Sequence, residues 1–210
     1  MYVRRKAVTL FSLVLALMLV AAGCSSPAPK QESVPGGKAP SAQQEVKRLS
    51  GPMAEQPALI TSIGQSADAQ MVKALATKAA LKFEFNPLAT EAQIPTGTKT
   101  LVAVIGGSSK GLGAAGIKAE DELARAKALV AKAKAENLKV VALHVGGEAR
   151  RGALSDGFIK EIAPQADLLI VVEEGNKDGL FTQIAASKEI PLELVPNVSA
   201  SLEPLKKAFK

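Results

Sequence analysis

Apolar runs alternate with amphipathic stretches along the chain after about residue 57. The apolar runs are rich in Val, Ile and Leu and predict strands at residues 58–64, 81–85, 100–107, 138–147, 167–175 and 190–195. The stretches between them have apolar residues at helical spacing and predict helices at residues 67–80, 120–137, 154–165, 180–189 and 201–209. Strands that are apolar throughout are typical of a parallel sheet covered by helices on both faces. The pattern therefore predicts an α/β fold, a three-layer sandwich with a mainly parallel sheet that is flavodoxin-like or Rossmann-like.

The helix predicted at residues 120–137 has the clearest pattern. Acidic residues occupy its first turn, and one stripe of its surface is apolar, made of Leu123, Ala126, Leu129, Val130 and Ala133. We interpret it as a plain scaffold helix.

The beginning of the chain has the pattern of an export signal. Three basic residues precede an apolar run at residues 7–20, which is short for a bilayer span, and small residues lead up to Cys24. The sequence VAAGC resembles the lipobox of bacterial lipoproteins, in which the cysteine is lipidated and becomes the mature N-terminus. Cys24 is also the one cysteine of the chain, so it has no intramolecular disulfide partner. Residues 1–23 are therefore predicted to be a lipoprotein signal peptide, with an ordinary signal peptide or a short membrane helix as the alternatives.

Lipidation at Cys24 predicts that the protein is held on a membrane in the cell envelope, outside the cytoplasm. Residues 25–56 are rich in Pro, Gly, Ser, Gln and charged residues and have few large apolar ones. Such a segment does not bury enough surface to order itself. We therefore expect residues 24–56 to be the lipidated cysteine and a disordered tether, and residues 57–210 to be a single α/β domain.

Charge excludes one class of partner. The whole chain has 26 basic and 20 acidic side chains, a net charge of +6. Removal of residues 1–23 takes away three basic residues and leaves 23 against 20, a net charge of +3. With no tryptophan and few aromatic residues, the chain has neither a basic stripe nor a stacking platform. No nucleic-acid partner is expected.

Glycine, hydroxyl, amide and charged residues gather just after the predicted strands. A parallel sheet brings these positions to one edge, and open α/β sheets bind ligands in the crevice there. Backbone N–H groups of the glycine-rich loop, with Lys110 and the arginines, would suit a small polar or anionic ligand. The candidate ligand-binding residues are Gly64, Gln65, Ser66, Asp68, Gly106, Gly107, Ser108, Ser109, Lys110, Gly111, His144, Gly146, Gly147, Arg150, Arg151, Glu173 and Asn176.

The segment GGSSKGLGAAG, residues 106–116, matches two glycine spacings found in dinucleotide-binding enzymes. Its context does not fit, because the loop follows the third strand, no acidic residue ends the next strand, and the one tyrosine, Tyr2, lies in the signal. No cofactor is therefore expected. We interpret the loop as an anion cradle and expect a bulky side chain at Gly107 or Gly111 to abolish ligand binding without unfolding the domain.

A small envelope hydrolase is an alternative function. The segment GSSKG has the G-x-S-x-G spacing of a nucleophile elbow, so Ser109, or else Ser66, would act with His144, the one histidine. The acids between Ser109 and His144 lie in or beside one surface helix, where they do not suit a triad, although residues 173–178 supply acids after a later strand. A protein-interaction module of the envelope is a third possibility.

Metal chemistry has little support in the sequence. The segment EGNKDG, residues 174–179, is similar to the start of a calcium loop, but Ala185 stands where the closing glutamate is needed. With one histidine and no usable cysteine, no metal site is expected.

Residues 58–209 resemble an uncharacterised family of single-domain bacterial lipoproteins known as a domain of unknown function. The motifs that carry the resemblance are TSIGQSADAQMV, GGSSKGLGAAGI, GGEARRG, LSDGFI and VVEEGNKDG. The resemblance implies an envelope address and a shared site at the loop edge, and it brings no established activity. We therefore expect an extracytoplasmic, lipid-anchored protein that binds a small polar or anionic solute, as an accessory of a membrane transporter or as a sensor.

Cys24→Ser should block lipidation and leave the chain unprocessed or detached from membranes, because serine has no thiol to acylate. Metabolic labelling with a fatty-acid probe measures this. Label on the variant equal to that on the parent would contradict the lipobox.

Overall fold

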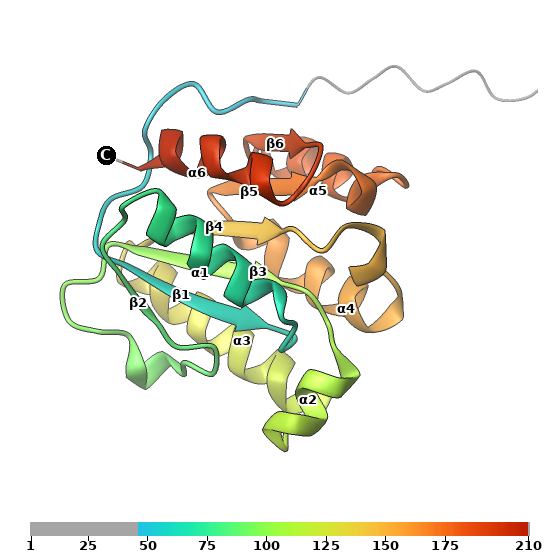
Figure 1. Ribbon diagram of the computed structural model, residues 1–210. Helices are drawn as coiled ribbons and strands as arrows, with labels where there is room; N and C mark the ends of the chain where they lie inside the picture. The colour runs from blue at the N-terminus through green and yellow to red at the C-terminus, as the bar shows by residue number, and fades with distance from the viewer. Residues whose placement is uncertain (1–45, 210) are drawn as a thin grey trace, which may run out of the picture. The chain divides into compact units, whose positions relative to one another are not determined.

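The computed structural model describes residues 46–209, which form a six-stranded, all-parallel sheet between two layers of helices (Figure 1). The order of the strands is β2-β1-β3-β4-β5-β6, which extends the flavodoxin-like order by one strand. This confirms the predicted α/β sandwich. The predicted signal peptide, Cys24 and the first part of the predicted tether lie outside the described residues. The strands are β1 (Ala58–Ile63), β2 (Phe83–Phe85), β3 (Thr100–Ile105), β4 (Lys139–His144), β5 (Leu168–Val172) and β6 (Leu192–Val195).

Helices cover both faces of the sheet. α1 and α6 pack on one face, and α3, α4 and α5 pack on the other. No helix in residues 46–209 is both long and apolar enough to cross a membrane. The α-helices are α1 (Asp68–Lys78), α2 (Ser109–Ala115), α3 (Ala119–Ala135), α4 (Ala153–Ile162), α5 (Leu180–Lys188) and α6 (Leu202–Ala208). The 3-10 helices are η1 (Glu91–Gln93), η2 (Gly147–Arg150), η3 (Ala163–Gln165), η4 (Glu173–Asn176) and η5 (Ser199–Ser201).

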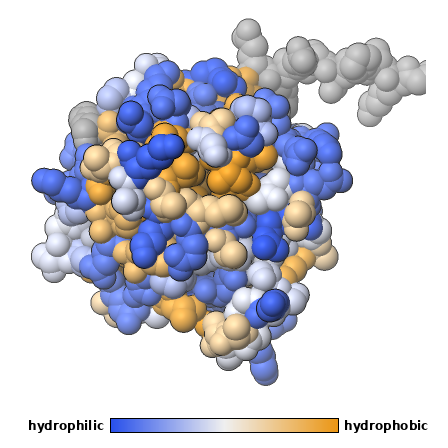
Figure 2. Space-filling model, viewed as in Figure 1, coloured by the Kyte–Doolittle hydropathy of each residue, from blue (hydrophilic) through white to orange (hydrophobic). Residues whose placement is uncertain are grey.

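Two apolar layers, one on each face of the sheet, make the core. In β3, Leu101, Ala103 and Ile105 face the α3, α4 and α5 layer, while Val102 and Val104 face α1 and α6. Every residue of β1 and β3 is therefore buried, which is why their sequences are mostly apolar. The outer surface over α1 and α6 is mostly hydrophilic, with apolar side chains gathered between the two helices (Figure 2).

Residues 109–115 form a short helix, α2, where the sequence predicted only a glycine-rich loop. Ser108 caps its start, because its side-chain oxygen accepts a hydrogen bond from the Gly111 N–H at 3.0 Å. Gly116 ends it in the left-handed conformation, with φ at 67°. Glycine is a poor helix former, so the local sequence did not predict a helix here. The helix is defined by the caps at its two ends.

Residues 46–56, which the sequence places in the disordered tether, pack against the domain. Leu49 and Ala54 are buried. At the outer edge of the sheet, the N–H of Leu192 in β6 donates to the carbonyl oxygen of Lys47 at 2.9 Å. The packed part of the chain therefore begins before residue 57. Composition does not reveal this segment, because the bonds that hold it come largely from backbone groups common to all residues.

A buried ion pair on α3 ties the loops after β1 and β2 to the helical layer. Glu122 is fully buried, Arg125 is 10% exposed, and the two side chains are 2.8 Å apart. The same Glu122 oxygen accepts hydrogen bonds from the Gly64 N–H at 2.8 Å and from the Gln65 amide at 2.9 Å. The Arg125 guanidinium donates to two backbone carbonyls, one in β1 and one in the β2–β3 connection. The pair therefore positions the loop from which α1 begins.

Arg125→Met should lower the free energy of unfolding by about 3–5 kcal/mol, because it leaves the buried Glu122 carboxylate without its positive partner. Urea unfolding followed by circular dichroism measures this. As a control, Lys132→Met breaks the exposed pair with Glu136 on the same helix and should cost less than about 1 kcal/mol. Equal losses in the two variants would show that the Glu122–Arg125 pair has no special role.

Candidate functional site

Three of the predicted loops meet at the carboxyl ends of β1, β3 and β4. β1 and β3 are neighbours in the sheet, but the helices that follow them, α1 and α3, cover opposite faces (Figure 1). Connections that leave in opposite directions open a crevice between them, where open α/β sheets bind ligands. The structure thus brings together the predicted residues of segments 64–68, 106–111 and 146–150 at this topological switch point.

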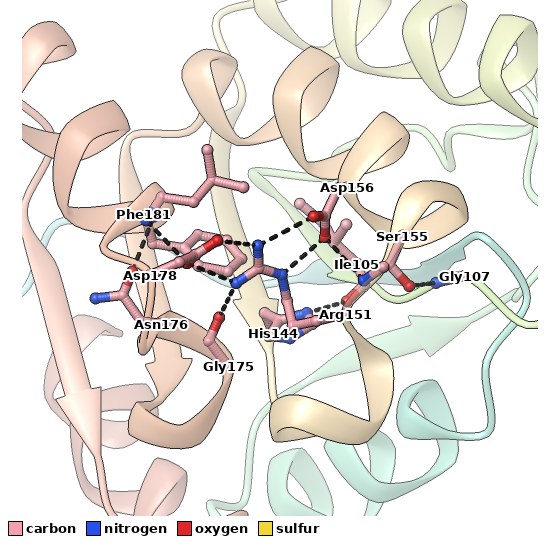
Figure 3. Close-up of polar contacts among 12 residues, drawn as sticks. Ile105, Gly107, His144, Arg151, Ser155, Asp156, Gly175, Asn176, Asp178 and Phe181 are labelled. Atoms are coloured by element: carbon pink, nitrogen blue, oxygen red, sulfur yellow. Dashed lines mark hydrogen bonds and ion pairs between the residues drawn. The ribbon is translucent and has the colours of Figure 1, made fainter. Parts of the chain in front are cut away.

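The backbone donors of the glycine-rich loop are used inside the fold. The N–H of Ser108 donates to the carbonyl oxygen of Gly64 at 2.8 Å, and that of Gly106 donates to the last residue of β1 at 2.9 Å. The N–H of Gly107 donates to the Ser155 hydroxyl at 2.8 Å (Figure 3). These bonds fasten the loop to β1 and α4. The anion cradle of backbone N–H groups that the sequence predicted is therefore not formed by these residues.

Close packing of the backbone explains several of the glycines. A Cβ at Gly111 would lie 1.8 Å from the carbonyl oxygen of Gln65. A Cβ at Gly107 would lie 2.8 Å from the Leu154 side chain and 3.0 Å from the backbone of α4. A bulky side chain at either position therefore strains the fold, which corrects the expectation that it would only block a ligand.

A carboxylate and a guanidinium meet at the crevice. Asp68, the first residue of α1, has a side chain that is 3% exposed, and its Oδ1 lies 3.4 Å from Arg150 Nε. Asp68 Oδ2 is buried and has no hydrogen-bond partner among residues 46–209. The Ser66 hydroxyl accepts a long hydrogen bond from the Asp68 N–H, at 3.3 Å. The structure thus places three predicted residues together, and one carboxylate oxygen among them has no hydrogen-bond partner in residues 46–209.

The next residue, Arg151, is held by the fold. Its guanidinium contacts the Asp156 and Asp178 carboxylates, each at 2.7 Å, and also donates to the carbonyl oxygen of Gly175 (Figure 3). Hydrogen bonds from Arg151 lower the pKa of Asp178 to about 2 and also lower the pKa of Asp156. Arg151 therefore joins the loops after β4 and β5, and Arg150 is the arginine beside the crevice.

His144 is buried at the end of β4 between two backbone carbonyls. Its Nδ1 lies 3.0 Å from the oxygen of Ile105 (Figure 3). Its Nε2 lies 3.3 Å from the oxygen of Gly147. The ring packs against Phe181, with 5.1 Å between the ring centroids. Burial lowers the pKa of His144, and the two carbonyl contacts partly oppose this. The imidazole therefore joins β3, β4 and η2 as part of the core.

The serine and histidine of the alternative hydrolase do not meet. Ser109 is exposed at the start of α2, and Ser66 is buried in the loop after β1. Within residues 46–209, neither serine is hydrogen-bonded to His144, whose ring nitrogens both lie against carbonyl oxygens. The structure therefore does not form the predicted pairing.

The remaining predicted residues have varied surroundings. Asn176 caps the start of α5, because its side-chain oxygen accepts a hydrogen bond from the Phe181 N–H at 2.9 Å. Gln65 belongs to the network around the buried pair on α3. Lys110 and Glu173 are exposed, and neither has an ion-pair partner in the part of the chain that the structure describes.

Residues of the calcium-like segment serve the fold. Asn176 is the cap of α5, and Asp178 pairs with Arg151. Across residues 46–209, no group of three or more His, Cys, Asp or Glu side chains is placed to hold a metal ion.

The sequence interpretation missed Glu122 and Arg125, which organise the loop after β1. A signal was present, because Glu122 lies four residues before Ala126 and so falls on the apolar stripe of the helix. A carboxylate on a buried stripe requires a partner, and Arg125 is one turn away on the same helix. The interpretation of this helix as plain scaffold overlooked that requirement.

The fold and the crevice define a doubly wound α/β protein with polar groups at its topological switch point. The chain belongs to the family described as a domain of unknown function, DUF6305, whose model matches residues 55–209. The expectation of an uncharacterised family is thereby confirmed. No curated protein and no solved structure matches the chain.

Gly111→Ala should lower the free energy of unfolding by about 1–3 kcal/mol, because its Cβ collides with the Gln65 carbonyl oxygen. Gly113→Ala is the matched control in the same helix, since no atom lies within 4 Å of its added Cβ. That variant should stabilise the protein by about 0.5–1 kcal/mol through helix propensity. Urea unfolding compares the two, and effects of the same sign would contradict the packing explanation.

Proposed function

We propose that this chain is a lipid-anchored protein of the cell envelope that binds a small polar or anionic solute at the carboxyl edge of its sheet. One observation carries the proposal: within residues 46–209, the buried carboxylate of Asp68 has one oxygen without a hydrogen-bond donor, and it lies at the topological switch point. A buried polar atom without a partner costs stability. A ligand that donates a hydrogen bond to this carboxylate oxygen would remove that cost, so Asp68 supports a ligand there.

Positive charge at the same edge supports an anionic group on the solute. Arg150 is 32% exposed, and within the described residues its guanidinium contacts only Asp68. A guanidinium presents paired N–H donors that match a carboxylate or a phosphate. Lys110 is exposed on α2 and adds a second cation.

The surroundings of the edge favour binding over covalent chemistry. The ring nitrogens of His144 lie against backbone carbonyls, so the imidazole is not available as a base in this arrangement. Ser109 has no basic partner in residues 46–209 that would activate it.

The predicted lipid at Cys24 would determine where in the cell the binding site lies. A lipid anchor with a tether would keep the domain near a membrane surface. The domain is a single lobe, so we propose that it presents its solute to a membrane transporter, or senses it, rather than enclosing it between two lobes.

Binding is tested with the purified chain against a panel of carboxylates, phosphates, amino acids and nucleosides, first by thermal shift and then by calorimetry. A bound solute should raise the melting temperature, because it stabilises only the folded state. Arg150→Gln should weaken binding of a solute with an anionic group by about tenfold or more, and Asp68→Asn should do the same for a solute with a hydrogen-bond donor, since each variant removes a charge-assisted contact.

Asp121→Asn is the matched control for this experiment. It removes an exposed carboxylate from the first turn of α3 and should leave binding unchanged. A panel without any binder, or solutes that bind the two site variants as tightly as the parent, would overturn the proposed site.

A further inference from the structure

The surroundings of Asp68 show which chemical group the free carboxylate oxygen can accept. A Cβ at Gly106 would lie 3.0 Å from Asp68 Oδ2, and a Cβ at Gly146 would lie 2.5 Å from it. Both flanking residues are glycines, and their backbones pack so close to the carboxylate that a side chain at either position would collide with it. The group that completes Oδ2 must therefore be a hydrogen-bond donor small enough to fit between two backbones.

The side chain of Arg150 packs over this position. A Cβ at Gly146 would lie 2.0 Å from Arg150 Cγ, so the aliphatic part of the arginine rests on Gly146. Its only polar contact among residues 46–209 is the Nε–Oδ1 distance of 3.4 Å to Asp68, which is long for a hydrogen bond. Little therefore holds the arginine in place, and an incoming donor can displace it from the carboxylate.

The two charges together disfavour ligands that carry a single charge. A lone anion bound by Arg150 would be repelled by the Asp68 carboxylate beside it, and a lone organic cation at Asp68 would be repelled by Arg150. A hard metal ion needs several oxygen ligands, and no cluster of three acidic, His or Cys side chains is present in residues 46–209. A ligand that carries both a donor cation and an acceptor anion has neither difficulty.

We infer that the solute is a small zwitterion of the amino-acid class, an inference that rests on the proposed function. Its ammonium group donates to Asp68 Oδ2, and its carboxylate accepts from the guanidinium of Arg150. Binding exchanges one long contact between Asp68 and Arg150 for two charge-assisted contacts, one to each residue. The Ser66 hydroxyl, in the same loop, is placed to assist the ammonium end.

Calorimetry on the purified chain tests the inference with the twenty common amino acids and four probes that carry a single charge. Acetate and propionate lack the ammonium group, and methylamine and ethylamine lack the carboxylate. At least one amino acid should bind, and each single-charge probe should bind at least tenfold more weakly than the best amino acid.

The two variants separate the two ends of the ligand. Asp68→Asn should weaken amino-acid binding at least tenfold without weakening that of acetate, whereas Arg150→Gln should weaken both. Asp68→Asn keeps the shape of the side chain and an oxygen that can face Arg150, so the ligand-free variant should still fold, and its thermal unfolding checks this. If that variant does not fold, the comparison of amino acids with single-charge probes on the parent still decides.

Three results would overturn the inference, and they differ in what they leave standing. Acetate, propionate or phosphate binding as tightly as the best amino acid would make this an anion site and would leave the proposed solute binding intact. Equal amino-acid binding by the parent and Asp68→Asn would show that the ammonium group does not contact Asp68. If no amino acid, carboxylate, phosphate or nucleoside binds, the proposed solute-binding function is contradicted as well.

Discussion

The buried pair of Glu122 and Arg125 is the interaction on which the carboxyl edge of the sheet depends. Charges excluded from water are tolerated only when they are paired and their remaining hydrogen-bonding groups are satisfied. Here that satisfaction comes from the loop after β1, through the N–H of Gly64 and the amide of Gln65. The loop is therefore held against α3 while α1 leaves it toward the opposite face, and this fixes where Asp68 begins its helix.

A second set of contacts holds the other side of the crevice. Arg151 joins the loops after β4 and β5 through Asp156 and Asp178, while its neighbour Arg150 makes one long contact to Asp68. The loops on both sides are thereby fixed, while the Arg150 guanidinium between them keeps one long polar contact within the described residues. The same rigidity explains how the fold tolerates a buried carboxylate oxygen without a partner within residues 46–209.

The limits of prediction from sequence follow from the kind of interaction involved. The strands and the longer helices were predictable, because burial on one or both faces leaves a local periodicity. The helix α2 and the packing of residues 46–56 were not, because a serine cap, a C-terminal glycine and backbone hydrogen bonds leave little trace in hydropathy. The dense glycines after β3 were visible, but their spacing indicated a ligand cradle where the fold uses them for close backbone packing.

The sequence by itself determined the class of fold and the edge of the sheet at which polar residues collect, since strand and helix patterns are local and their alternation implies parallel strands. Only the tertiary structure decided which of those residues are partners. In the folded chain Arg151 pairs with Asp156 and Asp178, whereas its neighbour Arg150 lies beside the crevice. His144 is buried between two carbonyl oxygens. The reason is that a side chain's role is set by which groups lie within hydrogen-bonding distance, and those groups come from segments far apart in the sequence.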